Sequence, residues 1–227
     1  MEVVFRHWPD LLAGFWITTW VTAVTIILAT MLGFVVFMLR LSTNPICRAF
    51  ATVYIDAFQN TPYLIVVFII YFGLPEVGLT FSAYTSAIGG LSLYSAAYLA
   101  EAFRSGYLAI PREQLQGAAA CALRASTIFI HIIFPQATVY SIPAITNQWV
   151  RIALNSTVIS ILGGGDLLDQ ARNLAAVTFD VFPFYAIGAM GYWVLITPAA
   201  SLVRRCERAP KWRRAQLGLP LRQGRGT

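Results

Sequence analysis

A long uncharged segment near the start of the chain limits what this protein can be. No charged residue occurs between Leu11 and Leu39. A helix needs roughly 20 apolar residues to cross about 30 Å of hydrocarbon, so this segment is long enough to span a bilayer. The 227 residues are 58% hydrophobic and 11% charged, whereas soluble domains carry about 25% charged residues. These features predict an integral membrane protein.

Further apolar segments predict an all-α membrane protein with about five transmembrane helices. We expect one transmembrane domain over residues 1–227, with spans at about 11–39, 49–75, 84–107, 137–162 and 181–203. In the second span, Gln59, Asn60 and Thr61 precede Pro62 and interrupt the helical pattern. Irregular backbone inside a membrane is tolerated where it lines water or protein, so this break is expected to border a pathway.

The basic residues are unevenly distributed and predict the orientation of the spans. Eight of them follow residue 203, and others flank expected span ends that share one side: Arg40, Arg48, Arg104, Arg112 and Arg124. The positive-inside rule then places the N-terminus in the periplasm, and the loop 108–135 and the tail 204–227 in the cytoplasm. A basic tail beside a hydrophobic span usually contacts anionic membrane lipid, and we expect no nucleic-acid binding.

The sequence contains no recognisable catalytic, metal-binding or nucleotide-binding pattern. The cysteines Cys47, Cys121 and Cys206 lack metal-ligand spacing. Gly163–Gly165 is not followed by the Lys-Ser/Thr of a phosphate-binding loop. We therefore expect a protein that is not an enzyme, holds no metal and binds no cofactor itself.

Polar residues inside the expected spans mark a candidate substrate pathway, because such groups are costly in hydrocarbon and usually line a cavity or pair with one another. Asn147, Arg151 and Asn155 are spaced i, i+4, i+8, which places them on one stripe of the fourth span. The full set that we expect to line the pathway is Asn60, Thr61, Ser95, Tyr98, Asn147, Gln148, Arg151, Asn155, Ser156 and Thr157.

The charged residues of the third and fourth spans allow two interpretations. The planar fork of Arg151 suits a substrate carboxylate, but the same side chain would also neutralise a carboxylate of a neighbouring span or subunit, such as Asp56 or Glu101. Glu101 and Arg104 lie three residues apart on one helix, so we expect them to form an ion pair near the loop.

A charged loop separates the third and fourth spans. Pro111 is suited to open a helix there, because the first turn of a helix leaves its N–H groups unpaired. Small and apolar residues then recur at helical spacing and form one narrow face. This pattern predicts either a docking helix or a plain amphipathic connector on the membrane.

The loop resembles the EAA loop of the transmembrane subunits of bacterial ABC importers, which inserts into a groove of the ATPase. The matching residues are Ile110-Pro111, Gln114, Phe129 and Phe134-Pro135-Gln136-Ala137. The segments Phe58–Pro62, Tyr71–Pro75 and Leu91–Pro111 are similar to the polar amino-acid permeases, which serve His, Glu, Gln, Arg and opines. The chain differs from that pattern at Gln59, where Arg is usual, and at Leu154, where Lys is common.

The resemblance implies a type I ABC importer permease fold in the bacterial inner membrane, working by alternating access. It implies a second permease subunit, two ATPase subunits that bind ATP and Mg, and a periplasmic or lipid-anchored amino-acid-binding protein as partners. The residues expected at the ATPase contact are Arg112, Glu113, Gln116, Gly117, Ala118, Ala122 and Arg124.

The motif departs from the family at its centre, where Gln116-Gly117-Ala118 replaces Glu-Ala-Ala and Ala122 replaces Gly. Glycine in place of alanine costs about 1 kcal/mol of helix propensity. We hypothesise that the chain is half of a heterodimer whose partner carries the fuller motif, with a loosely coupled homodimer as the alternative. A competing function is that of an ion-coupled secondary amino-acid carrier, with Asp56 as its coupling residue, although such carriers usually contain internal repeats.

Overall fold

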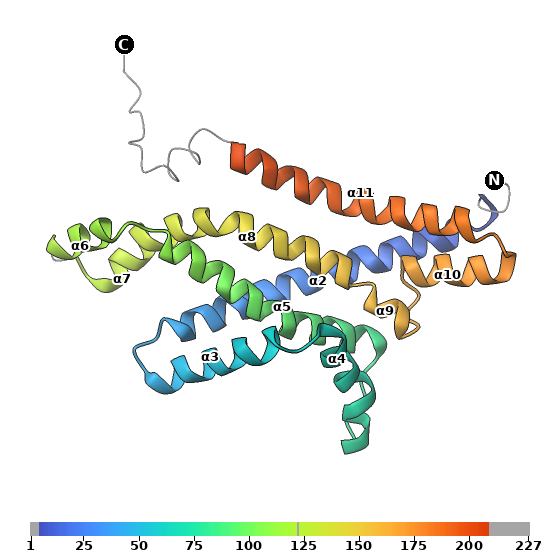
Figure 1. Cartoon of the computed structure of the whole chain (residues 1–227), viewed down its shortest axis with the longest axis horizontal. Helices are drawn as coiled ribbons and strands as arrows, with labels where there is room; N and C mark the ends of the chain where they lie inside the picture. The colour runs from blue at the N-terminus through green and yellow to red at the C-terminus, as the bar shows by residue number, and fades with distance from the viewer. Residues whose placement is uncertain (1–4, 122, 209–227) are drawn as a thin grey trace, which may run out of the picture.

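The computed structural model describes residues 5–121 and 123–208, and these residues form helices and connecting turns without any β-strand. Ala122 and residues 209–227 of the predicted basic tail lie outside this description. Figure 1 shows α2 and α5 crossing the middle of the molecule, with α8 and α11 on one side and α3 and α4 on the other. The four long helices are α2 (Trp8–Arg40), α5 (Ala83–Leu108), α8 (Phe134–Asn155) and α11 (Val181–Arg208).

The first predicted span lies within α2, which has 33 residues and is therefore about 50 Å long. Its buried residues include Thr18, Val21, Thr25 and Ala29, which recur every three or four positions and form one face. Three hydroxyl groups on this helix, those of Thr18, Thr19 and Thr30, donate to its own carbonyls; Thr18 Oγ1, for example, lies 3.0 Å from the Gly14 oxygen. These three side chains are thus compatible with an apolar environment.

The second predicted span is sharply bent at its break. It consists of α3 (Pro45–Gln59), α4 (Tyr63–Phe68), the π-helical η1 (Ile69–Gly73) and the 3₁₀ turn η2 (Leu74–Val77). The axes on either side of the break differ by 102°, so residues 49–75 do not form a single straight span. Proline at position 62 cannot donate a backbone hydrogen bond, and side chains occupy carbonyls at the break: Asn60 Nδ2 lies 2.7 Å from the Asp56 oxygen, and Thr61 Oγ1 lies 2.8 Å from the Ala57 oxygen.

Fewer helices meet a simple membrane-span criterion than the five spans expected from the sequence. Within the described ranges, three segments are long and apolar enough, Trp8–Arg40, Ser126–Ile161 and Val181–Pro198, or four if the bent pair counts as one span. Helix α5 has 26 residues and is about 39 Å long, so it meets the length requirement. Its sequence is rich in Ala, Gly and Ser, and half of its residues are buried, so it has less need of large apolar side chains.

The connection between α5 and α8 contains more helix than predicted. It consists of α6 (Arg112–Ala120), α7 (Ala125–Ile128) and the π-helical η3 (Phe129–Ile133). The long apolar segment that includes α8 begins at Ser126, eleven residues before the predicted start of the fourth span. The bounds of the coupling loop, 108–135, stay a prediction. The sequence analysis treated the apolar residues 128–133 as part of the loop, although they continue directly into α8.

A helix that the sequence analysis did not assign, α10 (Leu167–Thr178), follows the short α9 (Val158–Ile161). Asp166 caps it, and its buried carboxylate accepts hydrogen bonds from Ser160 Oγ at 2.6 Å, the Asp169 N–H at 3.2 Å and Tyr192 Oη at 3.2 Å. Burial raises the pKa of Asp166 above its ordinary value. This carboxylate therefore connects α9, α10 and α11 at one end of the molecule.

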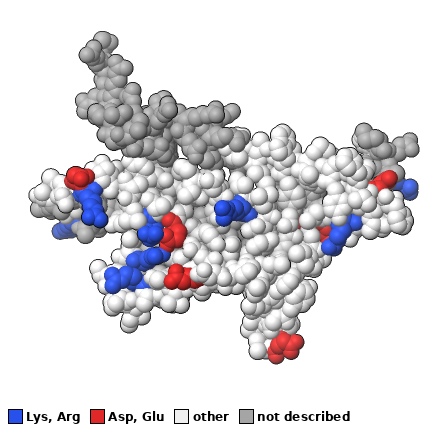
Figure 2. Space-filling model, viewed as in Figure 1, with Lys and Arg blue, Asp and Glu red and all other residues white. Residues whose placement is uncertain are grey.

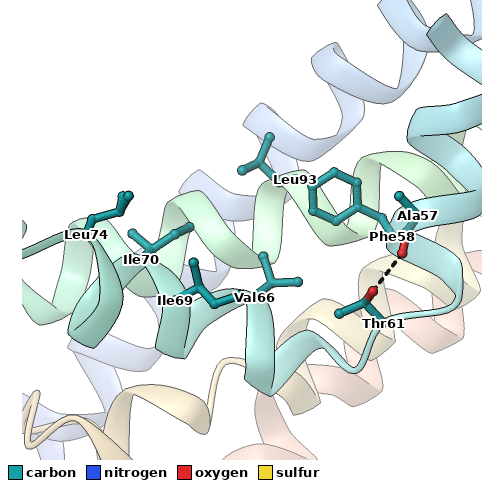
Figure 3. A pocket seen from close by; sticks show the side chains of 8 residues that line it. All are labelled: Ala57, Phe58, Thr61, Val66, Ile69, Ile70, Leu74 and Leu93. Carbon is teal, nitrogen blue, oxygen red and sulfur yellow. Dashed lines mark hydrogen bonds between the residues drawn. The ribbon is translucent and has the colours of Figure 1, made fainter. Parts of the chain in front are cut away.

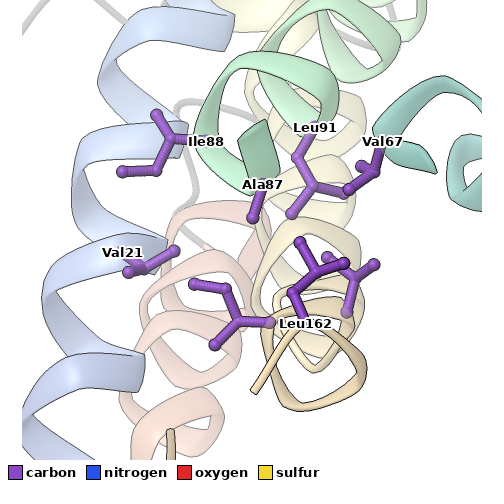
Figure 4. Packing of buried hydrophobic residues seen from close by; sticks show 8 residues of the cluster. Val21, Val67, Ala87, Ile88, Leu91 and Leu162 are labelled. Carbon is purple, nitrogen blue, oxygen red and sulfur yellow. The ribbon is translucent and has the colours of Figure 1, made fainter. Parts of the chain in front are cut away.

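Small and branched apolar side chains fill the spaces between the helices. Figure 4 shows one cluster in which Val21 of α2 and Val67 of α4 lie near Ala87 and Leu91 of α5. Lipid tails are as apolar as these side chains, so close packing stabilises such contacts more than exclusion from water does. The visible surface is mostly uncharged, with the few acidic and basic side chains in small groups (Figure 2), as expected for contact with lipid.

Candidate functional site

A polar pocket of about 400 Å³ lies between α5 and α8. This volume is within the range of small-molecule sites, roughly 300–1,000 Å³. Its α5 wall consists of Tyr98, Glu101, Ala102 and Ser105, and its α8 wall consists of Ala144, Asn147, Gln148 and Arg151. Both walls have the spacing i, i+3, i+4, i+7, so each is a single stripe of one helix.

Four of the predicted pathway residues meet in this pocket: Tyr98, Asn147, Gln148 and Arg151. Glu101 and Ser105 also line it, although the sequence analysis assigned Glu101 to an ion pair and did not select Ser105. Extending the face of α5 by two helical turns beyond Tyr98 would have identified both residues.

Glu101 forms a two-sided ion pair behind the pocket. Its Oε2 accepts a hydrogen bond from Arg104 Nε at 2.7 Å, which is the pair predicted from the sequence. Its Oε1 accepts a hydrogen bond from Arg40 Nη1, so that α5 is also joined to α2. Each carboxylate oxygen of Glu101 is therefore bound by a guanidinium group.

The opposite wall presents polar groups that have no partners among the described residues. Arg151 is exposed and, within the ranges that the structure describes, forms no ion pair or hydrogen bond, so neither Asp56 nor Glu101 neutralises it. Gln148 is only 6% exposed, and its amide makes no hydrogen bond to another described residue. The amide is not among the fully buried polar groups that lack a partner, so it opens onto the pocket, where a ligand or water can bind it.

Tyr98 connects the pocket to the break between α3 and α4. Its hydroxyl lies 3.4 Å from the Gln59 carbonyl oxygen and accepts a hydrogen bond from Tyr94 Oη at 3.2 Å. The break predicted to border the pathway therefore contacts a pocket residue through its backbone. Its side chains Asn60 and Thr61 do not line the polar pocket.

Other predicted pathway residues also lie outside the pocket lining. Ser95 is fully buried, and its hydroxyl has no partner among the described residues. Ser156 is buried and accepts a hydrogen bond from Thr22 Oγ1 of α2 at 3.3 Å, and Thr157 Oγ1 donates to the Leu154 oxygen. Asn155 ends α8 and is half-buried. The assignment of these residues to the pathway stays a prediction.

A second, apolar pocket of about 380 Å³ lies in the bend between α3 and α4. Figure 3 shows Phe58 and Thr61 at one end, Ile70 and Leu74 at the other and Leu93 of α5 above them. Thr61, the one hydroxyl in this lining, is already bonded to the Ala57 carbonyl. This pocket therefore suits apolar groups and offers a polar substrate few hydrogen-bonding partners.

The predicted ATPase-contact residues lie on or beside α6, which projects at one end of the molecule (Figure 1). Arg112, Glu113, Gln116 and Gly117 are exposed on this helix, and Arg124 is exposed in the turn before α7. A side chain added at Gly117 would meet no other atom within 4 Å. Ala118 of α6 is only 7% exposed, whereas the charged and amide side chains named above are exposed.

Comparison with known proteins identifies the family. A family model described as the binding-protein-dependent transport system inner membrane component matches residues 26–211. The chain belongs to this family. The predicted permease family is confirmed, and the membership supports a binding-protein-dependent importer over an ion-coupled secondary carrier.

Three similar permease proteins each match between 80% and 92% of this chain. A probable glutamine ABC transporter permease protein, GlnM of Bacillus subtilis, is 29% identical over 92% of this chain and 96% of its own length. The arginine transport system permease protein ArtQ of Bacillus subtilis is 30% identical over 89% of this chain and 93% of its own length. The glutamate transport system permease protein GluC of Corynebacterium efficiens is 33% identical over 80% of this chain and 87% of its own length.

Solved structures confirm the fold. An amino acid ABC transporter crystallised with histidines superposes with a TM-score of 0.85 and 27% identity, over 90% of this chain and 96% of that chain. The inward-facing MetNI methionine ABC transporter gives a TM-score of 0.70 at 18% identity, over 89% of this chain and 99% of that chain, which shows a shared fold. The chain is therefore an all-α, multi-pass permease subunit with the type I ABC importer fold, and permeases of this kind work with partner permease and ATPase subunits.

Proposed function

We propose that this chain forms half of the membrane pathway of an ATP-driven importer for polar amino acids. The observation that carries the proposal is the pocket between α5 and α8, where Arg151 and the amide of Gln148 line one space and neither has a partner in the described part of the chain. A guanidinium group suits an α-carboxylate, and amide groups both donate and accept hydrogen bonds, as an α-amino acid requires. The relatives named for glutamine, arginine and glutamate transport support this substrate class.

The expected assembly contains a second permease subunit, two ATPase subunits and a periplasmic or lipid-anchored binding protein. ATP and Mg bind in the ATPase subunits, and this chain holds no cofactor. The N-terminus lies in the periplasm, whereas α6 and the basic tail lie in the cytoplasm, consistent with the positive-inside rule. ATP binding and hydrolysis move α6, and α5 and α8 transmit this motion to the pocket between them.

Uptake into proteoliposomes tests the transport function. Vesicles containing the complete complex, with binding protein outside, should accumulate radiolabelled amino acid only when ATP is enclosed. Arg151→Ala should reduce this uptake at least about tenfold, because a hydrogen bond to a charged group contributes about 1.5–3 kcal/mol and each 1.4 kcal/mol corresponds to about a factor of ten. Arg48→Ala provides the matched control, since Arg48 is also an exposed arginine but lies outside the pocket. Uptake that follows an ion gradient without ATP would contradict the proposal.

The contact of α6 with the ATPase has a separate test. Cys121 is exposed immediately after α6, whereas Cys47 lies at the start of α3. A short thiol–amine cross-linker should join the chain to an ATPase subunit through Cys121. Cys121→Ser should abolish this product, and Cys47→Ser should leave it unchanged. A product that persists in Cys121→Ser and disappears in Cys47→Ser would place the ATPase elsewhere.

The second permease subunit is a homologous chain that carries the fuller EAA motif. The sequence Gln116-Gly117-Ala118 supports this pairing, since glycine in α6 weakens the helix and glutamine lacks the family's charge. Purification of the complex should yield two different permease chains in equal amounts. A fully active complex with two copies of this chain would refute the heterodimer.

A further inference from the structure

We infer that the pocket between α5 and α8 selects acidic amino acids and excludes cationic ones. This inference rests on the proposed function, because it names the substrate class of the same site. The observations that carry it are the charge balance of the groups around the pocket and the partners that those groups already have.

Glu101 is the one carboxylate in the pocket lining, and it is not available as the principal partner of a substrate cation. One of its oxygens accepts from Arg40 and the other accepts from Arg104 at 2.7 Å. Two guanidinium groups thus surround one carboxylate, and this group of three carries a net positive charge. A lysine or arginine substrate would have to compete with both residues for Glu101.

The facing wall adds a further positive charge. Arg151 lines the pocket from α8 and has no counter-ion in the part of the chain that the structure describes. Together with Arg40 and Arg104 it makes three cationic groups beside one anionic group. Like charges in and around one pocket repel each other even in a solvated site. The net positive charge therefore disfavours a cationic substrate side chain and favours a second substrate carboxylate.

The neutral groups of the pocket suit the rest of a dicarboxylic amino acid. Gln148, at 6% exposure, is a buried amide that makes no hydrogen bond to the described residues, and Asn147 lies beside it on the same stripe. Each amide can donate to a carboxylate and accept from an ammonium group. Arg151 would therefore bind one substrate carboxylate, and these amides would satisfy the second carboxylate and the α-ammonium group.

Selectivity is measured on the purified importer complex without added binding protein, so that only the membrane subunits contribute. Equilibrium binding of radiolabelled glutamate, glutamine and lysine should follow that order of affinity. Glutamate should bind at least about tenfold more tightly than lysine, as expected from one like-charge contact replaced by an opposite-charge contact. Equal affinity, or tighter binding of lysine, overturns the inference.

Three variants test the cause of the preference. Arg104→Ala frees one oxygen of Glu101, so the preference for glutamate over lysine, measured as the ratio of their binding affinities, should fall about fivefold or more. Glu101→Gln removes the carboxylate, so the same affinity ratio should rise. Arg48→Ala, outside the pocket, should leave the ratio unchanged. If Arg104→Ala does not fold, the unmodified complex and Glu101→Gln still decide the matter. ATP-dependent uptake with a preference for lysine refutes only this inference, whereas the absence of ATP-dependent uptake of any amino acid refutes the proposed function as well.

Discussion

Gly106 lies where α5 and α8 come into close contact, and replacing it by alanine should separate the walls of the pocket. A β-carbon at this position would meet Ser141 Oγ and the Ala137 carbonyl oxygen and would lie 2.8 Å from the Ser141 nitrogen. Two of these atoms belong to the backbone of α8, so a side-chain rotation cannot relieve the contact. Gly89 is a matched control on the same helix, since a β-carbon there would meet nothing within 4 Å.

The two substitutions should have different energetic effects. Each variant gains about 1 kcal/mol of stability, because alanine has a higher helix propensity than glycine. Gly106→Ala also incurs an overpacking cost of about 1–3 kcal/mol, so Gly89→Ala should be the more stable variant by about that amount. In a protein of this size, each kcal/mol of stability shifts the melting temperature by about 2–4 °C, so the melting temperatures of the two variants should differ by roughly 2–12 °C.

Thermal unfolding of the purified complex in detergent measures this difference. Gly89→Ala should melt at or above the temperature of the unmodified complex, and Gly106→Ala should melt below Gly89→Ala. Binding of amino acid should also weaken in Gly106→Ala, because its pocket walls are displaced. Equal melting temperatures for the two variants would show that α5 and α8 are not in close contact at Gly106.

Three further predictions concern other parts of the chain. Glu101→Gln should lower the free energy of unfolding by about 1–2 kcal/mol, because Arg40 loses its charged partner. Denaturation in detergent measures this change, and an unchanged stability would refute the two-sided ion pair. Burial raises the pKa of Asp166, so its contribution to stability is complete below about pH 4 and declines as the pH rises through the pKa of the folded state. Melting temperatures measured across this pH range should show the decline, and in Asp166→Asn the melting temperature should depend less on pH. Gly117→Ala should stabilise α6 by about 1 kcal/mol without a steric cost and protect it from limited proteolysis, and increased cleavage would contradict this expectation.

Local sequence patterns predicted the elements that depend on local rules. Pro62 identified the break between α3 and α4 because a missing N–H interrupts a helix wherever it occurs. The spacing of Asn147 and Arg151 identified the polar stripe of α8, since helical periodicity fixes which residues share a face. Pro111 likewise marked the start of α6 at the following residue.

Features that depend on tertiary contacts were not predicted. Arg40 and Glu101 are separated by 61 positions, and no local pattern shows that α2 and α5 bring them together. The 102° bend is set by packing on both sides of the break, and sequence reveals only its position. Helix α10 was missed because an amphipathic helix of 12 residues between two spans resembles a polar loop, although Asp166 followed by apolar residues at helical spacing was a usable signal.

The arrangement of α2 beside α5 also affects how the chain enters the membrane during synthesis. Once α2 has been synthesised, the ribosome must still make residues Leu41 to Leu108 before α5 is complete. At about 5–20 residues per second this takes several seconds. During that interval the threonines of α2 lack their later neighbours, but Thr18, Thr19 and Thr30 donate to carbonyls of their own helix. Only the hydroxyls of Thr22 and Thr25 are without such a bond among the threonines of α2. Helix α2 can therefore remain in the bilayer alone until α5 arrives, which permits the spans to be inserted in the order of synthesis.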